Sequence, residues 1–376
     1  MAPLKSSLAR TVGKLLGVQK DTDLSLRGHV QSIRQAASEK VAASGGNIAD
    51  ALAPGNGYKY HTFGTPGTFT VSAGKGADGI IEVLVVAGGG GGQKANSIAS
   101  GGAGAGGVVH ATSYAVTAGT YAVSVGDGGT PGDGGVPDTA PNIGTNGGDS
   151  YFGPSGARLT AKGGGRVGYW PGTGANTGGS GGGGTGTTSD YPFPAPVVAG
   201  KAATQGDETH PGAPGTITNY GNSGGNGGGG SPGAYLAGGG GGGAGAAGGN
   251  GGADGSTPAG GDGQPFPQFA YPLCFPSPYL PGFATPSNGI TGYQASPTSD
   301  HYGGGGGGGK HRAGGGNAQT GTGPGGKGGG GRGGNGQPTH SYSGLDYLGG
   351  GAGDAAGYED PGRSGGKGVV IVRYVA

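Results

Sequence analysis

Two stretches of the sequence resemble ligand-binding motifs. Residues 321–327 approach the phosphate-binding P-loop pattern, in which glycine amides cradle phosphates and a Lys contacts them. Gly328, however, stands where a Ser or Thr would hold magnesium, and no apolar strand precedes the stretch. Residues 248–251 resemble a calcium-binding repeat unit, but Asp254 falls one place late and no array of nonapeptides follows. We therefore expect neither a nucleotide site nor a calcium site.

Two histidines offer the remaining candidate chemistry. His301 and His311 flank the glycine run 303–309 and could share a metal ion, but no third ligand is close in sequence, so we favour a solvated loop. The single Cys274 excludes an intrachain disulfide and a cysteine metal site. No Ser, His and Asp set lies on a pattern that suggests catalysis. We expect no enzyme, no metal and no cofactor.

Glycine is the most frequent residue in the chain segments that would have to position these candidate ligands. The chain has 108 Gly among 376 residues, about four times the average usage of ~7%. Such a composition is typical of disorder, of collagen or of polyglycine II helices. Collagen needs Gly at every third position, and uninterrupted runs break that rule. The longest runs are 88–92, 181–184, 227–230, 238–243, 303–309 and 328–331.

We predict a bundle of polyglycine II helices. Such a helix has three residues per turn and no internal hydrogen bonds. Its N–H and C=O groups must therefore pair with neighbouring helices. Only residues without a Cβ allow close approach from several sides, and many short glycine tracts in one chain meet this need.

The overall composition limits the possible partners and compartments. Hydrophobic residues are 31% and charged residues 11%, so backbone pairing must supply much of the order. A net charge of +1 gives no reason to expect nucleic acid, and no apolar stretch is long enough to insert into a membrane. Lys5, Arg10 and Lys14 interrupt the apolar positions of the N-terminus, so we expect no secretory signal. Release inside a virus particle by lysis is one alternative route out of the cell.

Residues 1–43 are predicted to form a helical attachment segment. Apolar residues recur at three- and four-residue spacing over 3–17, and a second stretch follows Asp21 or Asp23, although Gly28 weakens it. These helices either pack on the chain's own β-domain or dock onto another subunit or a virion component, and we favour docking. The attachment candidates are Leu4, Leu8, Val12, Leu15, Leu16, Leu26, Val30 and Ile33.

A linker over 44–57 leads to a predicted small β-sandwich base, residues 58–162 plus 368–376. Residues 80–87 read as a strand buried on both faces, and the terminal strand 369–375 is expected to close the base. We predict three hairpins, in which strands flank turns rich in Gly, Pro and Ala. Their strands are 58–63 with 68–71, 114–116 with 121–125, and 151–152 with 157–161.

Residues 163–367 would be an insertion, the polyglycine II bundle, whose Gly-poor stretches form distal loops. The fold class is thus mostly β and irregular, with short N-terminal helices. The longest Gly-poor stretches, 190–220 and 264–302, are rich in Pro and aromatic residues, which suit rigid recognition loops. The receptor-binding candidates are Tyr169, Trp170, Tyr191, Phe193, Phe266, Phe269, Tyr271, Phe275, Tyr279, Phe283, Tyr293 and Tyr302. The alternative is that these rings pack together as a cap on the bundle.

Two parts of the sequence resemble known phage proteins. The segments YKYHTF, GTFTV and VLVVAGGGGG within residues 58–92, with the closing GVVIVRY of 368–374, look like the glycine-rich domain of bacteriophage tail-fibre and virion proteins, notably of marine phages. The stretch 21–34 resembles the start of phage structural proteins. In organisation the chain is similar to the tail-fibre tip adhesins of T-even-like phages, which are polyglycine II bundles with receptor-binding distal loops. Those adhesins lack the N-terminal helices and β-base predicted here.

The resemblance implies a virion adhesin, located in the phage tail and extracellular after lysis. Its partners would be other virion proteins, a bacterial receptor (a glycan or an outer-membrane protein) and further copies of itself. A purely architectural virion protein is the alternative. An ice-binding protein needs a flat, regular Ala or Thr face, which these tracts lack.

Overall fold

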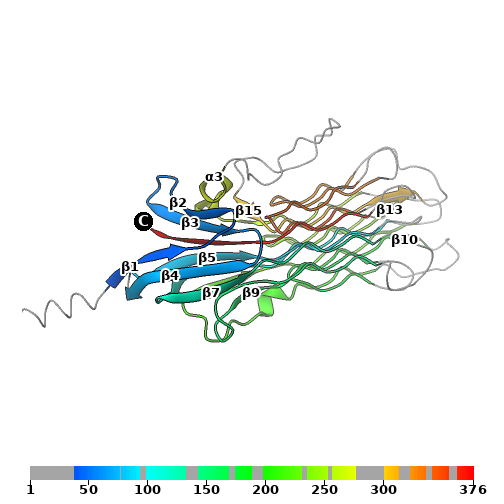
Figure 1. Cartoon of the computed structure of the whole chain (residues 1–376). Helices are drawn as coiled ribbons and strands as arrows, with labels where there is room; N and C mark the ends of the chain where they lie inside the picture. Colours follow the sequence, from blue (N-terminus) through cyan, green and yellow to red (C-terminus); the bar gives the residue numbers. More distant parts are fainter. Residues whose placement is uncertain are drawn as a thin grey trace, which may run out of the picture.

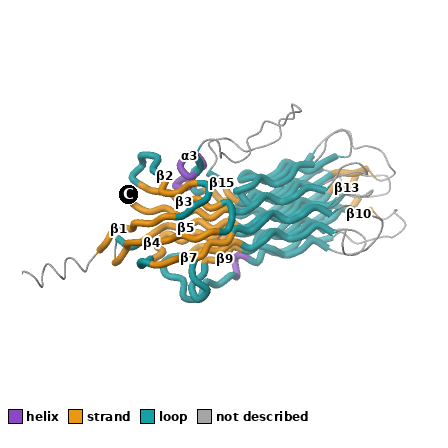
Figure 2. Tube along the Cα trace, in the orientation of Figure 1, coloured by secondary structure: helices purple, strands orange, loops and turns teal. Residues whose placement is uncertain are grey.

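The computed structural model describes twelve ranges of the chain. They are 38–76, 78–93, 99–132, 143–168, 174–188, 198–230, 235–252, 256–276, 300–312, 322–335, 341–354 and 362–376. Almost all the regular elements within these ranges are strands (Figures 1 and 2), as the sequence predicts. The helices are α3 (Tyr271–Cys274) and the 3₁₀ turns η2 (Gln205–Asp207) and η3 (Pro267–Phe269). The predicted helices within residues 1–37 lie outside the described residues.

Two antiparallel sheets form a sandwich at one end of the molecule. The six-stranded sheet has the order β11-β6-β5-β17-β3-β2 and the five-stranded sheet the order β1-β4-β7-β8-β9. The bounds of the first are β2 Ala49–Leu52, β3 Tyr58–Phe63, β5 Ile80–Val86, β6 Val108–Ala115, β11 Ile217–Tyr220 and β17 Val369–Val375. Those of the second are β1 Ser38–Ser44, β4 Gly67–Gly76, β7 Gly119–Ser124, β8 Ser150–Phe152 and β9 Leu159–Ala161.

The six-stranded sheet is buried on both faces, which explains its continuous apolar strands. Val83 and Val85 of β5 face the core between the sheets, whereas Leu84 and Val86 face a second core on the other side. Strand β17 alternates in the same way and pairs with both β5 and β3. The predictions for 80–87 and for a closing C-terminal strand are therefore confirmed.

Two of the three predicted hairpins are wrong. Strands β3 and β4 belong to different sheets, because β17 occupies the position beside β3. Strands β6 and β7 likewise belong to different sheets, with β6 paired to β5 and β7 to β4. Only β8 and β9 form the expected hairpin.

The predicted boundaries near the N-terminus also change. Residues 38–43, which the sequence places at the end of a helical segment, are part of strand β1 paired with β4. Val41 is buried in the sandwich core, so tertiary pairing overrides the weak helical pattern. The predicted linker 44–57 contains β2, which extends the six-stranded sheet.

Beyond the sandwich lies an elongated body of extended chain, teal in Figure 2, which we call the glycine array. It consists of the glycine tracts between residues 88 and 368, with short paired strands within it. These are β10 Thr187–Thr188 with β12 Gly229–Gly230, β13 Tyr235–Ala237 with β16 Lys310–Arg312, and β14 Gln264–Pro265 with β15 His301–Tyr302. The described parts of 88–107 and 126–148, which the sequence assigns to the base, belong to this array.

Backbone hydrogen bonds within the array repeat every third residue. The amides of Gly88 and Gly91 donate to the 145–148 tract, at 3.0 and 2.9 Å. Those of Gly89 and Gly92 donate to the 363–366 tract, and that of Gly90 to Gly104. Successive amides of one tract thus point to three different neighbours.

The tracts pack too closely for side chains. A Cβ at Gly88 would lie 2.1 Å from the carbonyl oxygen of Asp127, and one at Gly91 would lie 2.1 Å from that of Thr130. Both neighbours are backbone atoms of paired tracts, which cannot rotate away. Glycine is required here by close backbone approach.

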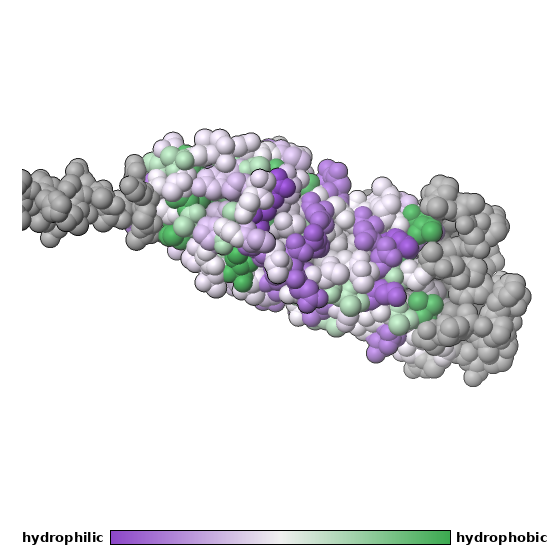
Figure 3. All heavy atoms as spheres, turned by 90° about the horizontal axis from the view of Figure 1, so that it is seen from below, coloured by the Kyte–Doolittle hydropathy of each residue, from purple (hydrophilic) through white to green (hydrophobic). Residues whose placement is uncertain are grey.

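Polar side chains replace the missing neighbour tract at the surface of the array. The carboxylate of Asp149 accepts from the Gly163 amide at 2.8 Å, and the Asn146 side chain accepts from the Arg166 amide at 3.0 Å. These two amides are again three residues apart. These caps were not predicted from the sequence. An Asn or Asp next to a glycine pair is the pattern that could have indicated them. Figure 3 shows hydrophilic residues gathered around the middle of one face, and Asp149 also pairs with Lys162 at 3.3 Å.

Candidate functional site

Several predicted receptor-binding aromatics are core residues, which corrects that prediction. They cover the outer face of the six-stranded sheet, where Tyr60, Leu84 and Ile371 complete the same cluster. The hydroxyl of Tyr302 donates to the carbonyl of Phe269 at 2.7 Å, so even the polar end of that ring is satisfied inside the protein. The buried candidates, exposed by 3% or less, are Phe266, Phe269, Tyr271, Phe275 and Tyr302.

This aromatic cover lies beside the base and not at a distal tip. Segment α3 sits next to β2 and β3, and β15 sits where the sandwich meets the array (Figure 1). The hydroxyl of Thr62 in β3 donates to the carbonyl of Cys274 at 2.7 Å, which fixes α3 on the sheet. Burial on an apolar sheet stabilises the rings more than exposure would. The rings therefore pack together, as the alternative expects, but on the sheet of the base and not as a cap on the bundle.

The other candidates lie outside the described residues. For receptor binding these are Tyr169, Trp170, Tyr191, Phe193, Tyr279, Phe283 and Tyr293, and for attachment Leu4, Leu8, Val12, Leu15, Leu16, Leu26, Val30 and Ile33. The described neighbours of 277–299, Pro276 and Asp300, lie with α3 and β15 near the base (Figure 1). The described neighbours of 189–197 include β10, at the far end of the array.

The structure separates the two histidines and engages the P-loop-like stretch in backbone pairing. His301 lies in β15 near the base and His311 in β16, which pairs with β13 at the far end (Figure 1). The intervening tract 303–309 would span roughly 22 Å at ~3.1 Å per residue. In the P-loop-like stretch, the amide of Gly326 donates to Gly305 at 2.9 Å and is unavailable to a phosphate. Among the described residues, no group of three or more His, Cys, Asp or Glu could hold a metal ion.

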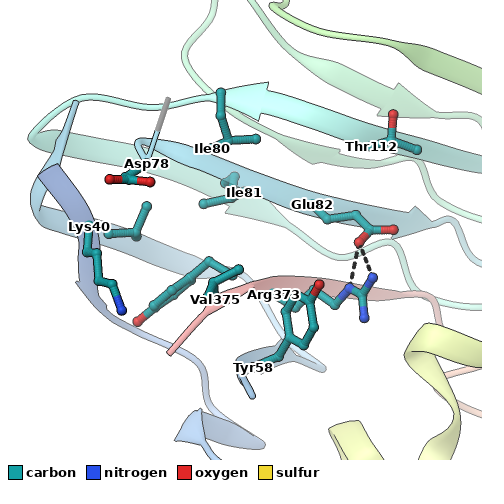
Figure 4. A pocket seen from close by; sticks show the side chains of 11 residues that line it. Lys40, Tyr58, Asp78, Ile80, Ile81, Glu82, Thr112, Arg373 and Val375 are labelled. Carbon is teal, nitrogen blue, oxygen red and sulfur yellow. Dashed lines mark hydrogen bonds and ion pairs between the residues drawn. The ribbon is translucent and has the colours of Figure 1, made fainter. Parts of the chain in front are cut away.

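The strongest charged cluster lies on the sheet face beside the aromatic cover. Strand β5 places Glu82 between His110 of β6 and Arg373 of β17 (Figure 4 shows the Arg373 pair). The carboxylate accepts from Arg373 at 2.5 Å, and its other oxygen lies 2.7 Å from Nε2 of His110. The amide of Gln268, from the cover, donates to Glu82 at 3.3 Å. The cluster therefore ties three strands and the cover together.

Electrostatics favour the charged form of Glu82. Burial by itself would raise the pKa of this carboxyl, but the hydrogen bond to His110 and the charge of Arg373 outweigh it and hold the pKa below its ordinary value. Both oxygens are occupied, so the carboxylate is poorly suited to accept a substrate proton. The cluster acts as a structural clamp.

A pocket of about 250 Å³ opens beside this clamp, at the end of the sandwich away from the array. Figure 4 shows Arg373 and Glu82 along one wall, with the Tyr58 ring next to the guanidinium. The carbon of that guanidinium lies 4.3 Å from the ring centroid, a cation–π contact. Lys40 of β1 and Asp78 contribute further charges of opposite sign. The pocket therefore has mixed polarity.

His61 forms a second polar site inside the base. Its Nδ1 lies 2.6 Å from the carbonyl oxygen of Gly45 and 3.1 Å from Asp50, and its Nε2 lies 3.1 Å from the Tyr374 hydroxyl. A carbonyl only accepts, so we assign the proton to Nδ1 and the hydroxyl of Tyr374 donates to Nε2. Burial lowers the pKa of His61, although the Gly45 carbonyl and the Asp50 charge oppose this.

We expect His61 to make the base less stable in mild acid. Its folded pKa lies below the ordinary value of 6.5, so the unfolded chain binds more protons as the pH falls through 6.5 towards the folded pKa. Stability should therefore decrease over that window, by at most ~1.4 kcal/mol per pH unit for one group. Urea unfolding at pH 7.5 and 5.5 measures the difference. His61→Asn keeps a donor near Gly45 and should reduce the pH difference, whatever its effect on stability at pH 7.5. An unchanged pH difference in this variant would assign the effect to other groups.

Comparison with known protein families gives a match over most of the chain. A family model described as a glycine-rich domain matches residues 62–375, which include most of the sandwich and the whole array. No curated protein matches the sequence. Within the described part of the chain, no helix is long and apolar enough to cross a membrane.

Proposed function

The chain belongs to a family defined by a glycine-rich domain, and from this premise we propose that it is a structural protein of a bacteriophage particle whose array is a polyglycine II bundle. The observation that carries the proposal is the three-residue repeat of hydrogen-bond partners, as at Gly88 and Gly91. A helix with three residues per turn directs successive amides to three neighbours in this way. The absence of room for a Cβ, as at Gly91, supports the same packing.

Such a bundle suits a rigid projection. Its order rests on backbone pairs between tracts that are far apart in sequence, so the chain cannot bend at one tract without breaking bonds to several others. The sandwich stands at one end, and strands β10 and β13 stand at the other, with their partners β12 and β16 (Figure 1). A rod of this kind separates an attachment end from a contact end without any chemical reaction.

We propose that the sandwich end attaches to other virion proteins. The N-terminal residues 1–37 join the described chain at Ser38, in β1, at the sandwich end (Figure 1). The apolar candidates Leu4, Leu8 and Val12 would then lie on the segment nearest the particle. The resemblance to tail-fibre and virion proteins, carried by the sequences of β3, β5 and β17, favours a place in the phage tail.

We further propose that the far end contacts the host surface, as in a tail-fibre adhesin. The buried aromatics of the cover cannot do so, which leaves the residues that join the far ends of the tracts. Tyr169 and Trp170 follow Gly168, and Tyr191 and Phe193 follow β10, so these four are the remaining receptor candidates at that end. Aromatic rings would stack on a glycan or fill pockets of an outer-membrane protein.

The test measures binding of the full chain to cells of the bacterium that the encoding phage infects. Trp170→Ala, Tyr191→Ala and Phe193→Ala together should weaken binding more than about tenfold, because aromatic anchors carry most of the energy of such interfaces. The thermal unfolding transition should stay unchanged, since the array is held by backbone bonds.

The matched control is Tyr279→Ala, Phe283→Ala and Tyr293→Ala together. These residues fall in 277–299, whose described neighbours lie near the base, so binding should be retained. If the far-end variant binds as well as the parent chain, the adhesin function is wrong. A purely architectural virion protein, the second candidate, then takes its place. The burial of the aromatic cover is the observation that favours this alternative.

A further inference from the structure

One loop closes a side of the sandwich. We call residues 204–216 the clip, which lies between β9 and β11, the outermost strands of the two sheets. Ala213 of the clip packs against the sandwich core. At the start of the clip, the Thr204 amide donates to the carbonyl of Gly178 in the array at 2.7 Å. The clip therefore covers the core where the two sheets would otherwise be open.

Two side chains of the clip take the place of a neighbouring strand beside β9. Oε1 of Gln205 accepts from the Lys162 amide at 2.7 Å, and Nε2 of Gln205 donates to the Thr160 carbonyl at 3.2 Å. Nδ1 of His210 accepts from the Thr160 amide at 3.2 Å. The outward backbone groups of this edge strand are thus satisfied by side chains of the clip.

These hydrogen bonds fix the protonation state of His210. A backbone amide only donates, so Nδ1, which faces the Thr160 amide, carries no proton. The proton is therefore on Nε2, which donates to the side-chain oxygen of Asn219 in β11 at 2.8 Å. That oxygen is identified because the side-chain nitrogen of Asn219 donates to the Glu208 carbonyl at 2.7 Å. The closed clip contains a neutral His210 that joins the two sheets.

A second proton on His210 is incompatible with the closed clip. It would add an N–H at Nδ1, directly opposite the N–H of Thr160, and this amide would lose its acceptor. An open clip leaves the ring free to bind this proton in water. The open state therefore binds more protons than the closed state, and opening becomes more favourable as the pH falls. Histidine changes its charge between about pH 5 and 8.

No carboxylate offsets this effect at His210. In the described part of the chain no Asp or Glu forms an ion pair with its ring, and Lys162 holds the carboxylates of Glu208 and Asp149 at 3.6 and 3.3 Å. The charged or titratable neighbours on the clip, β8, β11 and the ends of β9 are Tyr151, Arg158, Lys162, Asp207, Glu208 and Tyr220. Other described histidines lie beside a carboxylate that accepts from a protonated ring, and these pairs are His61 with Asp50, His110 with Glu82 and His301 with Asp300.

We propose that the clip is a proton-sensitive closure of the base, closed while His210 is neutral and released when its ring takes up a second proton. Release frees the outer edge of β9 and uncovers the core beside Ala213. Strands β5 and β17, which pair with each other inside the six-stranded sheet, stay in place. A free strand edge can pair with another extended chain. This inference concerns the base and does not rest on the receptor function.

Hydrogen–deuterium exchange of the full chain at pH 7.5 and 5.5 tests the proposal, with each rate corrected for the pH dependence of intrinsic exchange. The lower pH is still above the ordinary pKa of carboxylates, about 4, so histidines dominate the change. Protection of the segment 159–163 should fall at least about tenfold at pH 5.5, because the Thr160 amide loses its acceptor. This fall should exceed any fall in β5 and β17.

His210→Gln separates the clip from other effects of acid. Glutamine gains no proton in this range, so the excess fall in 159–163 should disappear, whatever the protection of this segment at pH 7.5. The matched control is His301→Gln, which removes another partly buried histidine, in β15 and away from β9 (Figure 1). It should lose protection in 159–163 like the parent.

Three results would each overturn the proposal. The first is an unchanged protection of 159–163 in the parent at pH 5.5. The second is an equal fall in 159–163, β5 and β17, which would indicate destabilisation of the whole base. The third is a His210→Gln chain that loses protection in 159–163 as much as the parent does. Failure of receptor binding would leave the proposal unaffected.

Discussion

Gly241→Ala should strongly destabilise the array. The new Cβ would lie 1.9 Å from the carbonyl oxygen of Ala103 and 2.9 Å from that of Gly102. The Gly241 amide also donates to Gly306 at 2.8 Å. No side chain can move aside to relieve this contact, because the clashing atoms belong to a paired backbone. We expect a loss above ~3 kcal/mol in the free energy of unfolding, at the upper end of overpacking substitutions.

Gly206→Ala is the control for this substitution. Gly206 lies in η2, is exposed, and a Cβ there would meet nothing within 4 Å. Its effect should stay within ~0.5 kcal/mol. Denaturant unfolding of both variants provides the comparison. A Gly241→Ala protein as stable as the Gly206→Ala protein would show that the tracts are not packed as closely as described.

Arg373→Met should produce the second largest loss of stability. The side chains of Arg373 and Glu82 are only 14% and 15% exposed, so removal of the guanidinium leaves a largely buried carboxylate with His110 and Gln268 as its remaining hydrogen-bond partners. Removing one member of a buried pair costs ~3–5 kcal/mol, and partial exposure reduces this to about 2–3 kcal/mol here. Methionine retains much of the packing against Tyr58 and Phe269, both of which contact Arg373. The measurement is the midpoint of urea unfolding at neutral pH.

The double variant Glu82→Met with Arg373→Met separates charge from packing. With both charges removed, no uncompensated group remains, so the double variant should lose less stability than the sum of the two single variants. Strict additivity would mean that the pair contributes nothing as a pair.

The clamp also predicts acid sensitivity. The pKa of Glu82 lies below 4.5, so its stabilisation is present above pH 4.5 and is lost as the pH falls through the lowered pKa.

Local pattern predicted several parts of this molecule correctly. A strand buried on both faces needs apolar residues at nearly every position, and 80–87 and 369–375 meet that condition without help from the rest of the chain. The turn sequence between 151–152 and 157–161 joins strands that are close in sequence, so the β8–β9 hairpin could also be predicted.

Other features depend on segments that are distant in sequence. Local turn residues favour hairpins at β3–β4 and β6–β7. In the structure β17, from the C-terminal end of the chain, takes the place beside β3, and β6 pairs with β5 and β11 instead of β7. The aromatic residues between 264 and 302 predict a large contact area, but the sequence alone does not show which surface they contact. Only the apolar outer face of β3, β5 and β17 turned Phe269 and Tyr302 into core residues.

The sequence by itself determined that the glycine tracts must pair with one another, because a chain with so few apolar side chains has no other source of order. It did not determine which tract pairs with which, since glycine carries no side chain to specify a partner. The tertiary structure decided this through the sandwich, which fixes where tracts such as 88–92 and 126–130 begin. Side-chain caps such as Asp149 and Asn146 complete the pairing at the surface of the array.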